Sequence, residues 1–131
     1  RVRVLLLLGL TVAAGTLIAF ALTEIVIGTL NTATGFLFSI IAGNGINFGI
    51  IFLSRYLDER TRGETPRTAC ELSRRETWRP TLAAALAAAA AYGALATTDL
   101  RAFRHFAFIG AVGMLSCWIA AFAILPSLVL V

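Results

Sequence analysis

Lysine is absent from this sequence of 131 residues, and charge of either sign is scarce. Charged side chains make up only 14 % of the chain, whereas a soluble domain usually carries about a quarter. Hydrophobic residues make up 59 %, and the mean hydropathy is +0.87. The shortage of charge excludes an ordinary soluble domain and predicts an integral membrane protein.

The basic residues are all arginine, and nine of the eleven lie at the N-terminus or in the segment 55–79. The formal net charge of +4 therefore reflects orientation in a membrane rather than a surface for nucleic acid. By the positive-inside rule we expect a protein of the cytoplasmic (inner) membrane, with both ends of the chain and the segment 55–79 on the cytoplasmic side.

The sequence also has few residues that commonly bind metals or act as nucleophiles: it contains two cysteines and one histidine. Cys70 lies in the charged segment and Cys117 in an apolar run, so we expect two free thiols. His105 has no second type of metal ligand beside it. The sequence shows no phosphate-binding glycine loop and no nucleophile–base pair. We therefore predict no enzymatic activity, no catalytic residue, no metal and no cofactor.

Four apolar stretches are long enough to cross a bilayer, at about 4–23, 33–53, 80–97 and 106–127. Twenty helical residues rise about 30 Å, which is the thickness of the hydrocarbon core. The pattern predicts an all-α, integral membrane helical bundle. Residues 28–31 have turn composition, with Thr32 or Thr34 as candidate caps of the next helix, and 97–105 are expected to form a short outer loop.

The segment 55–79 is too charged to span and is predicted to be a cytoplasmic loop. The second helix should extend into it as far as Gly63. Thr65 and Pro66 then have the chemistry of an N-cap and a first helical position, which predicts a short amphipathic helix. Pro80 would open the third span. Because the chain starts without methionine and its last residues are still apolar, we expect residues 1–131 to be an excerpt of a larger protein.

The run from Gly43 to Gly49 lies near the middle of the second span, and no charged residue occurs from Ile25 to Ser54. Side-chain amides are costly in hydrocarbon, which offers them no water. Asn44 and Asn47 are three residues apart and share one face of a helix. Glycines allow another backbone to come close. The glycines predicted to pack against another helix are Gly43, Gly45, Gly49, Gly110 and Gly113.

Further runs accompany this motif along almost the whole chain. They are Ser54-Arg55-Tyr56-Leu57-Asp58-Glu59-Arg60, Gly63-Glu64-Thr65-Pro66, Arg79-Pro80-Thr81-Leu82, residues 103–113 and Leu125-Pro126-Ser127-Leu128. Together they resemble the resistance–nodulation–division (RND) superfamily, most closely the MMPL-type lipid exporters, whose membrane part is related to the sterol-sensing domain. The resemblance implies that the four spans are the third to sixth helices of a six-helix half, in an exporter of a hydrophobic or lipidic substrate.

One position departs from the family pattern. Proton-driven members carry an Asp where this chain has Asn47, commonly followed by Tyr where this chain has Phe48. An amide does not ionise near neutral pH and cannot relay a proton in that way. The resemblance therefore implies that Asn44, Asn47 and Phe48 lie at the transport path or relay position, in a half that lacks the relay Asp.

Three alternatives stay open at this point. The chain could belong to a sterol-sensing-type module that binds lipid and regulates, to an RND-related subunit of the protein-export machinery, or to a helical scaffold whose amides only join helices. The expected partners are the lipid bilayer and the remaining helices and extracytoplasmic domains of the same protein. A homo-oligomer is left open, and nucleic acid is not expected.

Overall fold

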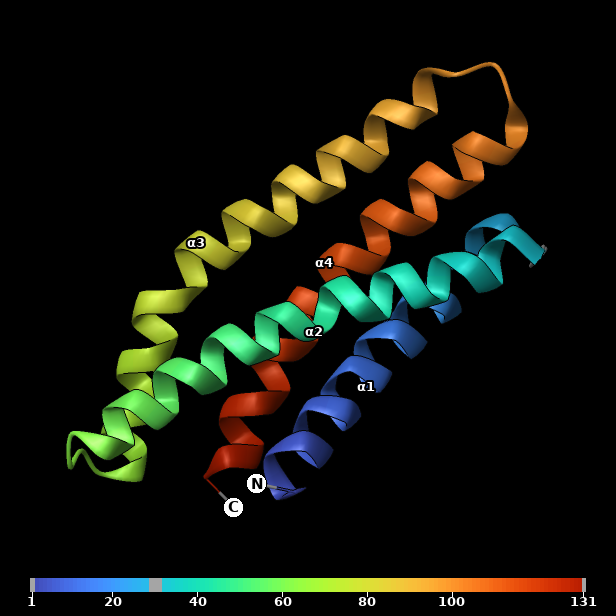
Figure 1. The fold of residues 1–131 in the computed structure, drawn as a ribbon. Helices are drawn as coiled ribbons and strands as arrows, with labels where there is room; N and C mark the ends of the chain where they lie inside the picture. The colour runs from blue at the N-terminus through green and yellow to red at the C-terminus, as the bar shows by residue number, and fades with distance from the viewer. Residues whose placement is uncertain (1, 29–31, 131) are drawn as a thin grey trace.

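The computed structural model describes residues 2–28 and 32–130, and within them it contains four long α-helices and no strand (Figure 1). Their bounds are Val2–Ile27 for α1, Thr32–Thr61 for α2, Pro66–Ala94 for α3 and Arg101–Val129 for α4, with a 3-10 turn, η1, at Leu95–Thr97. Each long helix is apolar enough over a sufficient length to cross a membrane. The predicted all-α membrane bundle is confirmed.

Helix α4 lies at the centre of the arrangement and contacts α1, α2 and α3. Helices α1 and α3 lie on opposite sides of α2 and α4 and make no contact with each other over the described residues (Figure 1). Large apolar side chains such as Leu17, Ile25 and Phe36 are exposed on the outside of the bundle. That distribution suits helices whose outer surfaces contact lipid rather than water.

The junction between α2 and α3 follows the local signals in the sequence. Gly63 has a φ of +93°, a conformation that glycine adopts without steric cost, and it ends α2. The Thr65 hydroxyl accepts a hydrogen bond from the Thr68 N–H at 3.3 Å, and Pro66 is the first residue of α3. Both features are those of a helix start and were predicted from the sequence.

Helix α3 runs without a break through Pro80, so the segment predicted as a separate short helix is its first half. Most of the predicted loop 55–79 is therefore helical. Pro80 removes one backbone donor, but neighbouring hydroxyls add bonds: Thr77 donates to the Ser73 carbonyl and Thr81 to the Thr77 carbonyl, each at 2.6 Å. Hydroxyl groups of this kind help a membrane helix to tolerate proline.

The predicted outer loop 97–105 is also shorter in the structure, because α4 already begins at Arg101. The Leu100 carbonyl accepts hydrogen bonds from the N–H groups of Phe103 and Arg104, at 3.0 and 3.3 Å, which forms the first turn of α4. At the end of α1, Gly28 has a φ of +70° and its N–H donates to the Glu24 carbonyl at 3.0 Å. The rest of the predicted turn, residues 29–31, lies outside the described residues, as do the side chains of Thr32 and Thr34.

Candidate functional site

The run from Gly43 to Gly49 is one unbroken stretch of α2, and its residues divide between two faces. Gly45, Phe48 and Gly49 are buried, while Asn44 and Asn47 are exposed. The spacing of three and four residues within each set is that of one side of a helix. The two amides and the two buried glycines are neighbours in the sequence, but they therefore lie on different faces of α2.

The glycine face of α2 lies directly against α4 and α1. A Cβ atom on Gly45 would lie 2.8 Å from the Sγ and 2.9 Å from the Cβ of Cys117 in α4. A Cβ on Gly49 would lie 2.5 Å from Leu8 Cδ2 in α1 and 3.2 Å from Leu125 Cδ1 in α4. Neither position has room for a side chain at this separation of the helices.

The glycines of α4 make contacts of the same kind. A Cβ on Gly113 would lie 2.5 Å from Ile41 Cδ1 in α2, and one on Gly110 would lie 2.5 Å from the Tyr92 ring in α3. Gly43, by contrast, has no atom within 4 Å of a built Cβ. The close approaches thus involve four of the five glycines named from the sequence.

Cys117 is a residue whose place sequence reasoning missed, because it was read only as a free thiol. Its Cα lies 2.9 Å from the Cβ that would stand on Gly15 of α1, and its side chain faces Gly45 of α2. It is 2 % exposed. Cys117 therefore occupies the point where three helices meet. The small residues Gly15 and Ala19, four apart in α1, were the available signal.

Phe48, which the resemblance places beside the relay position, belongs to the core. It is 5 % exposed and packs in a cluster with Leu8, Phe52 and Leu125. Asn47, the preceding residue, is on the exposed side. The structure therefore separates these two neighbours: the ring is buried among α1, α2 and α4, and the amide is presented to whatever lies outside the four helices.

A charged cluster joins the ends of α2 and α3 at the side of the bundle where the positive-inside rule places the cytoplasm. Arg55 of α2 donates to Asp58 at 2.9 Å and Glu59 at 2.7 Å, and it also contacts Glu76 of α3. Arg62 contacts Asp58 at 3.0 Å and Glu59 at 3.4 Å. The Glu59 side chain is 7 % exposed between the two guanidinium groups. A buried carboxylate requires such partners.

The described residues contain no group of three His, Cys, Asp or Glu side chains arranged to hold a metal ion. A tryptophan makes the one hydrogen bond between side chains of α3 and α4 that is found in the described residues: Trp118 Nε1 donates to the Thr81 hydroxyl at 3.1 Å. Packing at the glycines and this hydrogen bond thus hold the four helices together, and α2 presents Asn44 and Asn47 near its middle on the outside of that packing.

Comparison with protein families gives one match. The model of the MMPL family matches residues 2–131, which is nearly the full length of the chain. No curated protein and no solved structure matches.

Proposed function

Because the chain belongs to the MMPL family, we propose that it supplies the third to sixth helices of one half of an RND-type exporter of a hydrophobic or lipidic substrate. The observation that carries this proposal is the exposed pair Asn44 and Asn47 near the middle of α2, a helix that can span a membrane. In the intact protein these amides border the transport path.

The free-energy cost of exposing the two amides to lipid supports this assignment. An amide in an apolar medium without a hydrogen-bond partner costs roughly 2–7 kcal/mol. Two such groups are therefore a poor surface for lipid tails, and a further helix of the protein or a polar path would satisfy them. The opposite side of α2 is already used for packing through Gly45 and Gly49. The side of α2 that carries Asn44 and Asn47 therefore remains available for contact with a part of the protein that moves during transport.

The chemistry of Asn47 assigns a passive role in proton coupling to this half. A carboxylic acid at mid-membrane couples proton uptake to movement because it can be neutral in one state and charged in another. Asn47 keeps the size and the hydrogen-bonding groups but has no charge to switch. Proton-driven transport would then depend on an acid in the other half. We place the protein in the cytoplasmic membrane, with both ends of this segment cytoplasmic, on the arginine distribution.

Lipid flux in proteoliposomes tests the proposal. The full-length protein is reconstituted with a lipid that carries a nitrobenzoxadiazole fluorophore, a pH gradient is imposed, and dithionite added outside reports the lipid that has crossed. We expect gradient-dependent flux. Flux that equals that of protein-free vesicles for several lipid classes would favour the regulatory or protein-export alternatives.

The role of Asn47 is tested in the same assay with Asn47→Ala. A passive partner predicts that flux is retained within about threefold, because no proton passes through this side chain. The control is elution as a single folded species with unchanged thermal unfolding. Loss of flux in a well-folded Asn47→Ala protein would show that the amide itself works in the path.

A further inference from the structure

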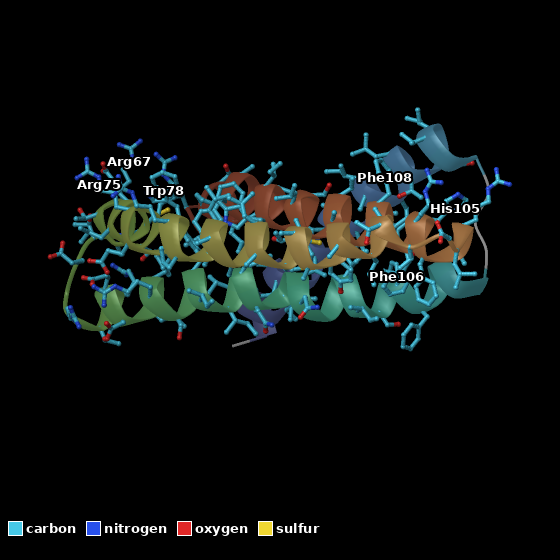
Figure 2. All side chains as sticks on the ribbon, turned by 90° about the horizontal axis from the view of Figure 1, so that it is seen from above. Arg67, Arg75, Trp78, His105, Phe106 and Phe108 are labelled. Carbon is cyan, nitrogen blue, oxygen red and sulfur yellow. The ribbon has the colours of Figure 1, made fainter. Side chains whose placement is uncertain are left out.

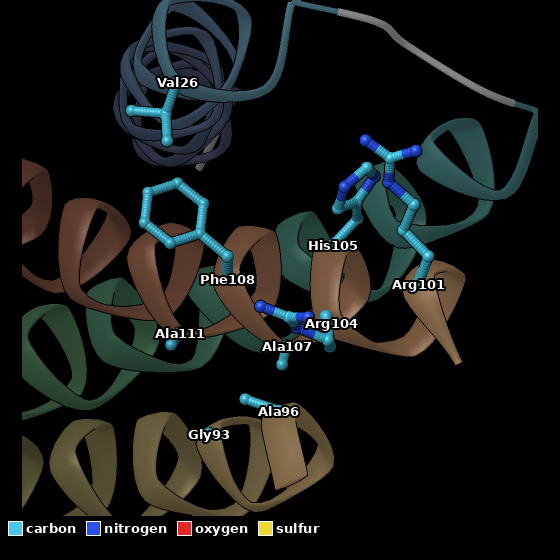
Figure 3. Close-up of a pocket in the computed structure, with 9 residues that line it drawn as sticks. All are labelled: Val26, Gly93, Ala96, Arg101, Arg104, His105, Ala107, Phe108 and Ala111. Carbon is cyan, nitrogen blue, oxygen red and sulfur yellow. The ribbon is translucent and has the colours of Figure 1, made fainter. Parts of the chain in front are cut away.

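A cavity opens at the end of the bundle opposite the charged cluster. It lies between α1, α4 and the end of α3 with η1, and its volume is about 630 Å³ (Figure 3). This is within the range of about 300–1,000 Å³ that is typical of small-molecule sites. We call it the outer cavity, because the arginine distribution places this end of the bundle on the non-cytoplasmic side.

The wall of the outer cavity is apolar. Phe108 of α4 points toward Val26 of α1, and Ala107, Ala111 and Ala96 line the surface below it (Figure 3). Phe108 is 36 % exposed although it is a large aromatic side chain. These residues provide a surface for a hydrocarbon chain, with no ionised side chain among them.

The rim of the same cavity is basic. Arg101 and His105 lie together at one end, and Arg104 extends along α4 toward Ala107 and Phe108 (Figure 3). Arg101 and Arg104 are exposed, and neither belongs to any ion pair found among the described residues. Asp99, the acidic residue nearest in sequence, and Glu24, near the end of α1, form no ion pair with either arginine in the described part of the chain.

The place of these two arginines requires a local explanation. The other nine lie at the N-terminus or in the segment 55–79, where the positive-inside rule accounts for them. Arginines on the other side run against that bias. At the charged cluster Arg55 and Arg62 are neutralised by acids, whereas at the outer cavity no ion pair of Arg101 or Arg104 is found among the described residues.

The geometry points to a binding site for an anionic phospholipid of the surrounding leaflet. Its phosphate would lie at the basic rim that Arg101 and Arg104 supply, because a guanidinium group matches phosphate oxygens. One acyl chain would lie on Phe108 and Val26. A free phosphate ion lacks that chain and would leave the apolar wall uncovered. This assignment names a substrate class for the exporter proposed above and rests on that proposal for its role, although lipid binding itself does not require transport.

Photocrosslinking tests the site in the full-length protein. The protein is placed in phosphatidylcholine nanodiscs that contain a small fraction of phosphatidylglycerol with a diazirine near the start of one acyl chain, or phosphatidylcholine with the same chain. Mass spectrometry then quantifies labelling of the peptide that contains Phe108 and Ala111. An arginine near an anionic head group changes affinity roughly fivefold. We expect phosphatidylglycerol to label this peptide at least fivefold more than phosphatidylcholine, and added inorganic phosphate to displace little of it.

The matched variants are Arg101→Gln/Arg104→Gln and, as the control, Arg67→Gln/Arg75→Gln at the opposite end of the bundle (Figure 2). Both remove two exposed arginines and the same charge. Only the first should bring phosphatidylglycerol labelling down to the phosphatidylcholine level. Ala111→Phe, which fills the cavity with the arginines intact, should lower labelling by both probes.

Three results would overturn the assignment. They are equal labelling of the Phe108 peptide by the two lipids, an equal loss in the two arginine variants, and no change in Arg101→Gln/Arg104→Gln. If that variant fails to elute as a folded species, Arg101→Lys/Arg104→Lys is compared with Ala111→Phe: the lysine variant, which keeps the charge, should keep both the labelling and the lipid preference, whereas Ala111→Phe should lower labelling by both lipids. No gradient or flux is involved, so loss of the site and failure of the exporter proposal are separate outcomes.

Discussion

Gly45 of α2 faces Cys117 of α4 so closely that a Cβ on the glycine would lie 2.8 Å from the cysteine sulfur. Gly43, two residues away on the same helix, has nothing within 4 Å of the same built atom. These two glycines share their helix and their depth and differ in their neighbours. The pair therefore allows the effect of helix packing to be separated from that of helix propensity.

Alanine at these two positions should have opposite effects. In an exposed helix interior, Gly→Ala stabilises by about 0.5–1 kcal/mol, which is the expectation for Gly43→Ala. Gly45→Ala should destabilise by about 1–3 kcal/mol, because the methyl group forces α2 away from α4. Thermal unfolding in detergent and folded yield measure both. Equal stability of the two variants would mean that α2 and α4 do not approach closely in the membrane.

The contact at Cys117 predicts a partial rescue. Cys117→Ala removes the sulfur that lies nearest to Gly45 and should recover part of the loss caused by Gly45→Ala. It should recover less of the loss caused by Gly15→Ala, because the nearest atom there is the Cys117 Cα at 2.9 Å. A double-mutant cycle of thermal stabilities provides the comparison. Full and equal rescue at both glycines would contradict the arrangement.

Alanine at Asn47 and at its neighbour Phe48 should have different effects on folding. Phe48 is 5 % exposed in the core cluster, so Phe48→Ala should lower stability by about 3 kcal/mol and reduce the folded yield. Phe48→Leu should restore most of it. Asn47→Ala should leave the yield unchanged, since this side chain is exposed. Loss of yield in Asn47→Ala would show that the amide is needed to hold the helices together, as in the scaffold alternative.

The charged cluster should depend on Glu59 more than on other acids of the same region. Glu59→Gln leaves Arg55 and Arg62 with one partner fewer around a buried position and should destabilise by about 1–3 kcal/mol. Glu71→Gln is the control, since Glu71 is exposed and forms no ion pair over the described residues. Because the Glu59 side chain is buried, the difference in midpoint of thermal unfolding should largely persist at high salt. A similar midpoint for both variants would show that the cluster adds nothing to stability.

Cysteine labelling tests the orientation on which several of these inferences rest. Thr68 and Thr98 are exposed at opposite ends of α3 and the turn after it, while Cys70 and Cys117 are buried. Thr68→Cys should react with a membrane-impermeant maleimide only from the cytoplasmic side, and Thr98→Cys only from the other. Reaction of both from one side would refute the topology.

The parts of the fold that were predictable are those set by neighbouring residues. Gly63, Thr65 and Pro66 carry their own conformational preferences, so the α2–α3 junction could be read directly. Apolar length was enough to identify four spans. Pro80 was misleading because its effect depends on the hydroxyls around it and on continued packing of α3 against α4, which a local rule does not include.

Which side of α2 is buried could not be predicted from the sequence, for a different reason. Asn44 and Asn47 fit one helical stripe, and Gly45 and Gly49 fit another a single residue away. Contacts with residues far along the chain, Cys117 at Gly45 and both Leu8 and Leu125 at Gly49, determine which stripe is covered. The outer cavity was missed because Arg101 and Arg104 were assigned to a loop, where it could not be seen that both line one cavity with α1 and the end of α3.

The absence of contact between α1 and α3 over the described residues has a mechanical consequence. A displacement of α1 can reach α3 only through α4 or α2, and Cys117 and Trp118 of α4 are adjacent residues that contact α1 and α3 respectively. Helix α4 would therefore transmit movement between α1 and α3. The close contacts at its glycines, Gly110 and Gly113, leave no free space between α4 and its neighbours. A small rotation of α4 would therefore displace both outer helices together.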